Sequence, residues 1–324
     1  MIAEKMKPYV KNNSAIRMMF EEGNRLRAIY GADKVYDFSL ENHIQTAGCS
    51  NCHNQILRCK FSSKAVVQRF RNRLAHILKS CITHITMKHC RLHFIHQINN
   101  SLLHTLRRRN TGVVYSEETI KKLAAILEKK QQEFGSVIYL ISDEPYRELA
   151  YDGVEVPYLT KYYDNTIVGY SYSKSLSLPG ERIGYLVIPD EADGSEELIT
   201  AAAIANRTIG CVNAPSLMQK VIAKCVDAEV DVAAYDKNRL ALYNGLKECG
   251  FECIKPQGAF YLFVKSPVAD EKAFCEAGKK YNILMVPGSS FACPGYERLA
   301  YCVSYDTIIN SLPEFKKLAE EFGL

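Results

Sequence analysis

Three short, continuous runs of apolar residues constrain the fold of this chain more than any other feature. The runs are Val137–Ile141, Thr166–Val168 and Ile183–Ile188, and their apolar residues do not alternate regularly with polar ones. Such runs are typical of strands that are buried on both faces, as in a parallel sheet. A helical pattern precedes the first run, with Ser116 as its N-cap and Gly135 at its end. The alternation predicts an α/β fold with a mainly parallel sheet.

Chemically useful side chains follow two of these strands. Asp143 comes just after the first run, and Ser171–Lys174 follows the second. Both sets should therefore lie at the carboxyl edge of the sheet, where open α/β folds bind ligands. The Lys174 amine can hold an aldehyde cofactor as an imine and can move a proton. Ser171, Ser173 and Arg182 offer hydroxyl and guanidinium donors that suit a phosphate, and Gly180 and Gly184 allow a close backbone approach.

Asp143 and Tyr146 suit the other end of such a cofactor. A carboxylate beside a pyridinium nitrogen raises the pKa of that nitrogen, because opposite charges at short range favour the charged form. Tyr146 can hydrogen-bond a phenolate oxygen. Taken alone, Asp143 can equally be a loop cap after a buried strand. Together with Lys174, these residues predict a binding site for pyridoxal phosphate (PLP) and no metal site.

The motif around the lysine resembles that of a known family. Residues 171–184, SYSKSLSLPGERIG, resemble the lysine signature of class I/II aminotransferases, which are PLP enzymes of fold type I. A serine three residues before the lysine, a small residue one before, an arginine eight after and a glycine ten after all match. Further resemblances are Asp143-x-x-Tyr146 to the pyridine-binding motif, Thr111–Ser116 to the end of the Asn-Pro-Thr-Gly segment, and Gly258–Tyr261 to a strand of the small domain.

The resemblance is close over residues 111–324 and loose over residues 1–40, and it implies a fold and an activity. The implied fold is the PLP-dependent transferase fold type I, with an incomplete large domain and a smaller α+β C-terminal domain. The implied activity moves an amino group between an amino acid and a 2-oxo acid in a homodimer. Arg298 stands at the position that binds the substrate α-carboxylate in this family. Two alternatives stay open: an inactive remnant or PLP-sensing regulator, and another PLP enzyme such as a β-lyase or decarboxylase.

Residues 42–110 do not resemble the family. They hold twelve Lys and Arg residues, no Asp or Glu, and all eight histidines of the chain. No Gly or Pro occurs between Cys49 and Thr111. In the family this region is about seventy residues longer and supplies a phosphate loop, a ring-stacking aromatic and a tyrosine for the partner subunit. Here Glu41 replaces a substrate-binding glycine, and Arg109 stands where the family has its catalytic asparagine.

Several explanations of this segment are open. Its composition favours a stretch translated out of frame, which would account for the loss of every family motif at once. Cys49-x-x-Cys52-His53 has the ligand types of a metal module, although the Cys-x-x-Cys pair does not recur, and it also spells a haem c attachment pattern. A basic stretch without acids also suits a nucleic-acid-binding insert, but aromatic residues are scarce there. We therefore expect no nucleic-acid partner.

The remaining expectations concern domains and location. The first ten residues carry charges at Glu4, Lys5 and Lys7, so we expect no secretory signal. We also expect no membrane span, reduced cysteines and a cytoplasmic protein. The expected regions are an N-terminal arm and helix (1–41), the basic segment (42–110), the PLP-binding part (111–205) and the small domain (206–324). Expected C-terminal elements are helices near 196–206, 213–249, 270–280 and 306–322, and strands at 259–264 and 299–304.

Overall fold

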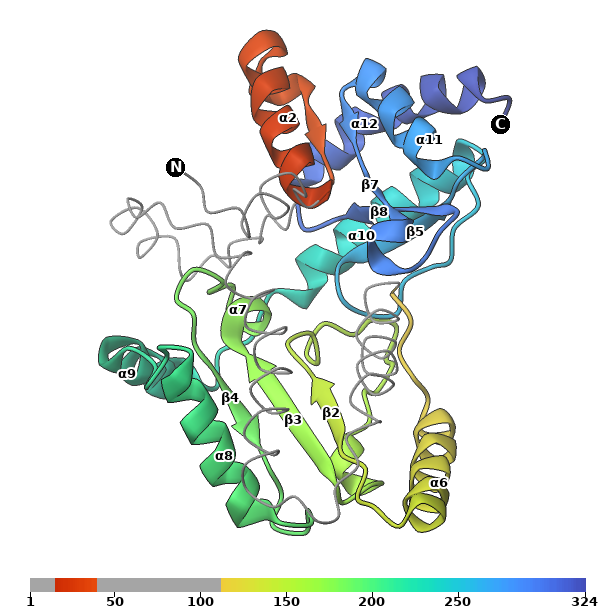
Figure 1. The fold of residues 1–324 in the computed structure, drawn as a ribbon. Helices are drawn as coiled ribbons and strands as arrows, with labels where there is room; N and C mark the ends of the chain where they lie inside the picture. The colour runs from red at the N-terminus through yellow and green to blue at the C-terminus, as the bar shows by residue number, and fades with distance from the viewer. Residues whose placement is uncertain (1–14, 40–111) are drawn as a thin grey trace, which may run out of the picture. The chain divides into compact units, whose positions relative to one another are not determined.

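The computed structural model describes residues 15–39 and 112–324 of the chain (Figure 1). The described residues form two compact units, each of which is treated by itself below. The first unit holds residues 15–39, 112–113 and 231–324, and the second holds residues 114–230. The segment 42–110 lies outside the described residues, so each explanation of it stays a prediction. The four-part division of the chain, with a boundary at 205 and 206, also stays a prediction.

A three-stranded sheet with the order β2-β3-β4 forms the centre of the second unit. Strand β2 (Leu140–Asp143) pairs in parallel with β3 (Thr166–Ser171), as the apolar runs predict. Strand β4 (Gly184–Val187) instead runs antiparallel to β3. The expectation of an α/β fold is confirmed, although this sheet is mixed.

The prediction that β4 is a parallel strand buried on both faces was wrong. A parallel connection needs a crossover of a dozen or more residues, usually through a long helix. Residues 172–183 contain only the short helix α7 (Tyr172–Ser175), and the chain turns straight back. Tyr185, Leu186 and Val187 are all exposed. An apolar run predicts a strand but does not show whether both of its faces are covered.

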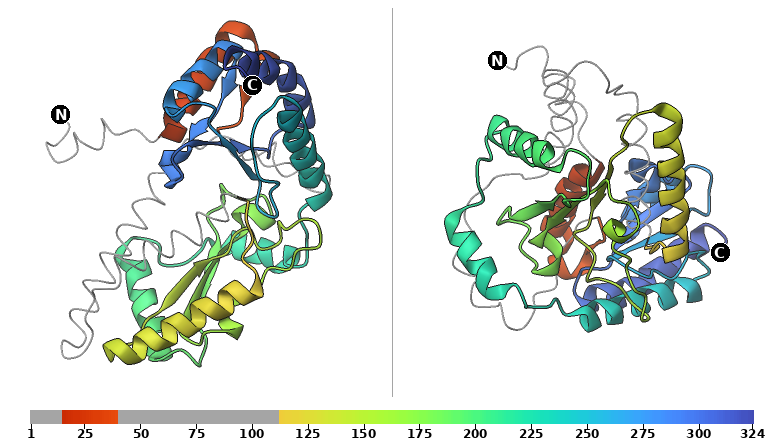
Figure 2. Two further views of the ribbon diagram at one scale, coloured as in Figure 1. Left: turned by 90° about the vertical axis from the view of Figure 1, so that its right-hand side faces the viewer. Right: turned by 90° about the horizontal axis from the view of Figure 1, so that it is seen from below.

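Helix α6 (Glu117–Phe134) begins and ends where the sequence predicts. The Ser116 hydroxyl accepts a hydrogen bond from the Thr119 amide, and Gly135 takes the left-handed conformation with φ 59°. Ile120 and Leu127 on one face of this helix pack in a core with residues of the first strand run. Figure 2 shows α6, in yellow, against the three-stranded sheet from two further directions.

The long helix expected over residues 213–249 is in fact two helices. Helix α9 (Ser216–Cys225) and helix α10 (Val232–Glu248) are separated by a turn. Asp231 begins the second helix, because its side chain accepts a hydrogen bond from the Ala234 amide at 2.9 Å. An aspartate binds the backbone more readily at a helix start than in a helix interior. Before α9 lies α8 (Ser195–Thr208), as predicted.

The first unit contains an antiparallel sheet with the order β5-β8-β7 and a parallel pair, β1 and β6. The helices α10, α11 and α12 supply the buried apolar residues Leu242, Phe274 and Leu318. Asn238 on α10 donates to the carbonyls of Tyr301 and Val303, so it ties the helix to the chain after β8. The elements are α2 (Ala15–Tyr30), β1 (Tyr36–Asp37), β5 (Tyr261–Lys265), α11 (Glu271–Gly278), β6 (Ile283–Leu284), β7 (Val286–Pro287), β8 (Tyr296–Ala300) and α12 (Tyr305–Glu321). Short 3-10 turns lie at Ala32–Lys34, Leu159–Lys161, Lys279–Tyr281 and Gly288–Phe291.

Candidate active site

The carboxyl edge of the parallel strand pair carries the predicted cofactor residues of the second unit. Asp143 is the last residue of β2 and stands opposite Gly169 of β3. The chain after Asp143 is held there, because the Glu144 amide donates to the Gly169 carbonyl at 2.7 Å. Ser171 ends β3 two residues later and begins α7. The register thus brings the Asp143 turn and the lysine motif to the same edge of the sheet.

Helix α7 presents Lys174 from a buried position. The Ser171 hydroxyl accepts a hydrogen bond from the Ser173 amide at 3.2 Å and so starts the helix. The Lys174 side chain is only 8% exposed, which is low for a lysine. Its Nζ atom lies 5.5 Å from the centre of the Tyr146 ring. Two of the predicted residues, from different strands, are therefore neighbours.

Of the predicted phosphate ligands, the two serines lie together, whereas Arg182 makes a different contact. The hydroxyls of Ser171 and Ser173 are 2.6 Å apart and hydrogen-bond each other. Arg182 is exposed and has a left-handed φ of 55°, and its Nη1 donates to the Pro179 carbonyl at 2.6 Å. To bind a phosphate, Arg182 would therefore have to exchange this hydrogen bond. Gly184 has a clear structural role, since a Cβ there would lie 2.3 Å from the Tyr170 carbonyl oxygen.

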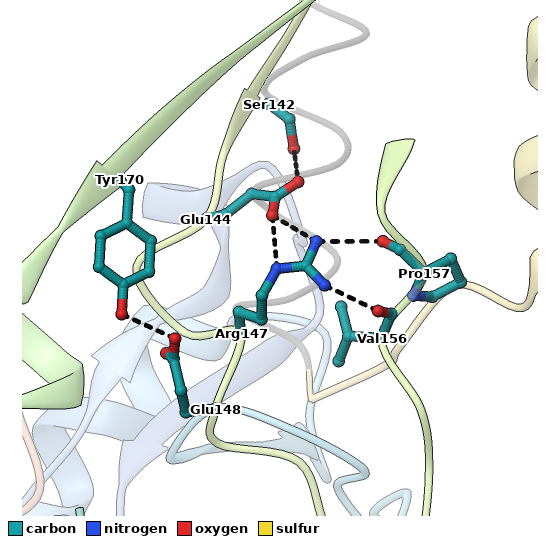
Figure 3. A network of polar contacts seen from close by, with 7 residues as sticks. All are labelled: Ser142, Glu144, Arg147, Glu148, Val156, Pro157 and Tyr170. Carbon is teal, nitrogen blue, oxygen red and sulfur yellow. Dashed lines mark hydrogen bonds and ion pairs between the residues drawn. The ribbon is translucent and has the colours of Figure 1, made fainter. Parts of the chain in front are cut away.

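The sequence did not predict a polar network centred on Glu144 and Arg147, which follow Asp143 in the chain (Figure 3). Glu144 is almost fully buried and accepts hydrogen bonds from the Ser142 hydroxyl and from Arg147 Nε, both at 2.7 Å. Arg147 also donates to the carbonyls of Val156 and Pro157, at 2.8 and 3.1 Å. Opposite charges three residues apart after a strand were the available signal. The network fixes the turn that carries Asp143 and Tyr146.

Arg298, the predicted substrate ligand, belongs to the first unit. It is buried on β8, and its guanidinium carbon lies 4.3 Å from the Tyr261 ring centre and 4.0 Å from that of Phe291. Guanidinium groups stack favourably on aromatic rings, so the two rings hold this side chain in a defined place. Its role towards a substrate stays a prediction.

The residues of the second unit fit PLP in their chemistry. They include a buried amine for an aldehyde, a carboxylate at a strand end for a ring nitrogen, and adjacent hydroxyls for a phosphate. Within the described part of the chain, the Ser177 hydroxyl is buried without a hydrogen-bond partner, three residues after Lys174. An unsatisfied buried hydroxyl costs free energy, and a bound polar group would remove that cost.

The described residues give no support for a metal site or for a helix that crosses a membrane. In residues 15–39 and 112–324, no three His, Cys, Asp or Glu side chains gather as metal ligands would. In the same ranges, no helix combines the length and the apolar character that crossing a membrane requires. The Cys49–His53 pattern lies outside these ranges.

Comparisons with known proteins extend over most of the chain. The sequence model of the family described as aminotransferase class I and II matches residues 84–310. The chain is 31% identical to the aspartate aminotransferase of Thermotoga maritima and 34% identical to a probable N-acetyl-LL-diaminopimelate aminotransferase of Bacillus subtilis. Each of these matches covers 62% of this chain and 51% of the relative. The chain thus spans about half the length of the curated relatives it matches.

Solved structures give the same result. A crystal structure of an aminotransferase from Eubacterium rectale is 36% identical, covers all of both chains and has a TM-score of 0.80. The Thermotoga maritima aspartate aminotransferase is 28% identical over 64% of this chain and 53% of that structure, with a TM-score of 0.55. The expected PLP-dependent transferase fold is confirmed. The motif around Lys174, the fold and the family match over residues 84–310 agree, and the chain belongs to the aminotransferase class I and II family.

Proposed function

We propose that this protein is a PLP-dependent aminotransferase that moves an amino group between an amino acid and a 2-oxo acid. One observation carries the proposal. Lys174 is buried on a short helix at the carboxyl edge of the sheet, beside Tyr146 of the turn that begins at Asp143. A buried amine at this edge of the sheet is placed to condense with the aldehyde of a bound ligand.

Each residue has a defined task in this proposal. Lys174 would hold the cofactor through its amine and would move the proton at the substrate Cα. Asp143 would keep the pyridine nitrogen of the cofactor protonated, and Tyr146 would donate a hydrogen bond to its phenolate oxygen. Ser171, Ser173 and Arg182 would bind the phosphate, and the family resemblance assigns the substrate carboxylate to Arg298, whose guanidinium suits a planar carboxylate. PLP itself supplies the ring that stabilises negative charge at the Cα.

Absorption spectroscopy with added PLP tests the proposal. We expect a visible band from the lysine-bound cofactor in the wild-type protein and none in Lys174→Ala. Borohydride reduction followed by peptide mass spectrometry should place the label on Lys174 alone. A wild-type protein that shows no band and no label at Lys174 would refute the proposal. Product analysis then identifies the reaction, since transamination yields a 2-oxo acid plus a new amino acid, whereas β-elimination yields ammonia and pyruvate.

The alternatives receive less support. The relatives and solved structures described above carry the name aminotransferase, which gives no support to a β-lyase, a decarboxylase or a sensing role. An inactive protein stays an outcome of the product assay, because Glu41 and Arg109 stand where the resemblance expects a glycine and an asparagine. A homodimer and a cytoplasmic location are further parts of this proposal, and light scattering of the purified protein tests the dimer.

A further inference from the structure

A tyrosine hydroxyl connects the turn after Asp143 to the helix of Lys174. The Tyr170 hydroxyl lies 2.7 Å from Glu148 Oε1 and 2.7 Å from Ser175 Oγ. Glu148 lies on the turn that follows Asp143, and Ser175 is the residue directly after Lys174 on α7. Figure 3 shows the first of these two contacts. The phenol therefore joins two segments that each carry a predicted cofactor residue.

The chemistry of the three groups assigns each proton. Burial raises the pKa of Tyr170 well above its usual value, so the phenol is neutral and carries one proton at neutral pH. The Glu148 carboxylate is the stronger acceptor and takes that proton in a charge-assisted hydrogen bond. The Ser175 hydroxyl, which is buried, then donates to the phenol oxygen. The chain of hydrogen bonds from the turn to the helix is complete.

The two segments that Tyr170 connects, the turn after Asp143 and helix α7, both carry predicted cofactor residues. The turn is stiffened by the buried pair of Glu144 and Arg147, so its end at Glu148 cannot shift without moving the residues before it. Helix α7 is a single turn, and helices this short have little stability of their own. A contact at Ser175 therefore has a large effect on where the neighbouring Lys174 lies.

We propose that Tyr170 is a positioning residue, whose hydroxyl fixes the Lys174 amine relative to Asp143 and Tyr146. This inference rests on the proposed function for its consequence in cofactor binding. Its structural part, the placement of the lysine, can be measured without cofactor.

Packing alone is the competing explanation for Tyr170, and a single substitution separates the two. The Tyr170 ring stacks on Tyr185 at 5.0 Å and meets the edge of Tyr172 at 5.3 Å. Tyr170→Phe keeps the ring and removes only the hydroxyl. Tyr139→Phe is the matched control, because the Tyr139 hydroxyl donates to the Asp193 carbonyl at 2.6 Å in the same unit.

Two measurements on the full-length protein test the proposal. The first is the acylation of Lys174 by N-hydroxysuccinimidyl acetate without cofactor, measured by mass spectrometry relative to Lys122, whose side chain is 72% exposed. We expect Tyr170→Phe to raise the relative rate about threefold or more, as local opening becomes easier. The second is the dissociation constant of PLP from the visible band. We expect it to rise about tenfold, the change that a loss of 1.4 kcal/mol produces.

Variants at Glu148 provide the rescue test. Glu148→Gln keeps an acceptor for the phenol and should resemble wild type, whereas Glu148→Ala should resemble Tyr170→Phe. The double variant Tyr170→Phe/Glu148→Ala should be no worse than Tyr170→Phe alone, since Tyr170→Phe already removes the hydrogen bond to Glu148.

Failure of this inference differs from failure of the proposed function. If Tyr170→Phe matches Tyr139→Phe in Lys174 acylation, the positioning role is refuted, whatever the cofactor does. If Lys174 acylation responds as expected but wild-type protein shows no lysine-dependent band with PLP, the proposed function fails and the positioning of the amine stands.

Discussion

Glu297 on β8 is a buried carboxylate whose substitution should change how stability depends on pH. Its side chain is fully buried, and among the described residues neither of its carboxylate oxygens has a hydrogen-bond partner. Burial raises the pKa of Glu297 to about 8. The nearby Ser266 hydroxyl acts to lower this pKa, and the nearby charge of Glu271 acts to raise it. Glu271 stays charged, because hydrogen bonds from Ser289 and Gly295 outweigh its own burial and lower its pKa.

The size of the effect follows from the two pKa values of Glu297. In the unfolded chain the carboxyl titrates near 4.5, and in the folded protein near 8. Between these values the folded state binds one proton more than the unfolded state, so the free energy of unfolding falls by about 1.4 kcal/mol per pH unit. The stability that the protonated Glu297 carboxyl contributes is fully present below pH 4.5. It is lost as the pH rises from there through 8, and the total loss in the free energy of unfolding is up to about 5 kcal/mol.

Glu297→Gln should remove this pH dependence, because an amide does not titrate. We expect the variant to match wild type near pH 4.5 and to be more stable by up to about 5 kcal/mol above pH 8. Hydrogen exchange of the β8 amides between pH 5 and 9, corrected for intrinsic rates, measures the unit that contains Glu297. Glu252→Gln is the control, since Glu252 is 70% exposed and pairs with Lys265 at 2.6 Å in the same unit. Equal pH dependence in wild type and Glu297→Gln would refute the reasoning.

Substitutions at three further positions test the fold. Asn238→Ala removes two buried hydrogen bonds to backbone carbonyls and should lower the free energy of unfolding by about 2–3 kcal/mol, as measured by urea denaturation. Gly184→Ala places a Cβ 2.3 Å from the Tyr170 carbonyl and should cost about 1–3 kcal/mol; unchanged hydrogen exchange in β3 would contradict this. Ser116→Ala removes the N-cap of α6 and should cost about 1 kcal/mol, whereas Ser116→Asp should retain the stability of wild type.

Local signals along the chain predicted much of the second unit correctly. Ser116 and Gly135 predict both ends of α6 because a cap and a left-handed glycine act through the nearest backbone groups. The prediction of one long helix over residues 213–249 was wrong for a related reason. The helical pattern continues across the break, and Asp231 can be an N-cap or an ordinary surface residue until the fold places the chain.

In the candidate site too, some features could be predicted from local sequence and others depend on the folded chain. The placement of Lys174, Asp143 and Tyr146 at one edge of the sheet could be predicted because they follow two apolar runs, and their roles towards a cofactor stay predictions. The network of Glu144 and Arg147 could not be predicted, because it depends on burial and on the carbonyls of Val156 and Pro157. Only the folded chain brings these groups together.

The sequence by itself determined the fold class through its apolar runs and the family through the motif around Lys174, and it predicts Lys174 as the lysine that a cofactor would bind. Only the tertiary structure decided that β4 runs antiparallel with exposed side chains and that the Tyr170 hydroxyl reaches both Glu148 and Ser175. It also decided that no hydrogen-bond donor within the described ranges reaches the Glu297 carboxyl. Strand direction, burial and hydrogen-bond partners arise from segments far apart in sequence. A residue's own neighbours along the chain do not contain that information.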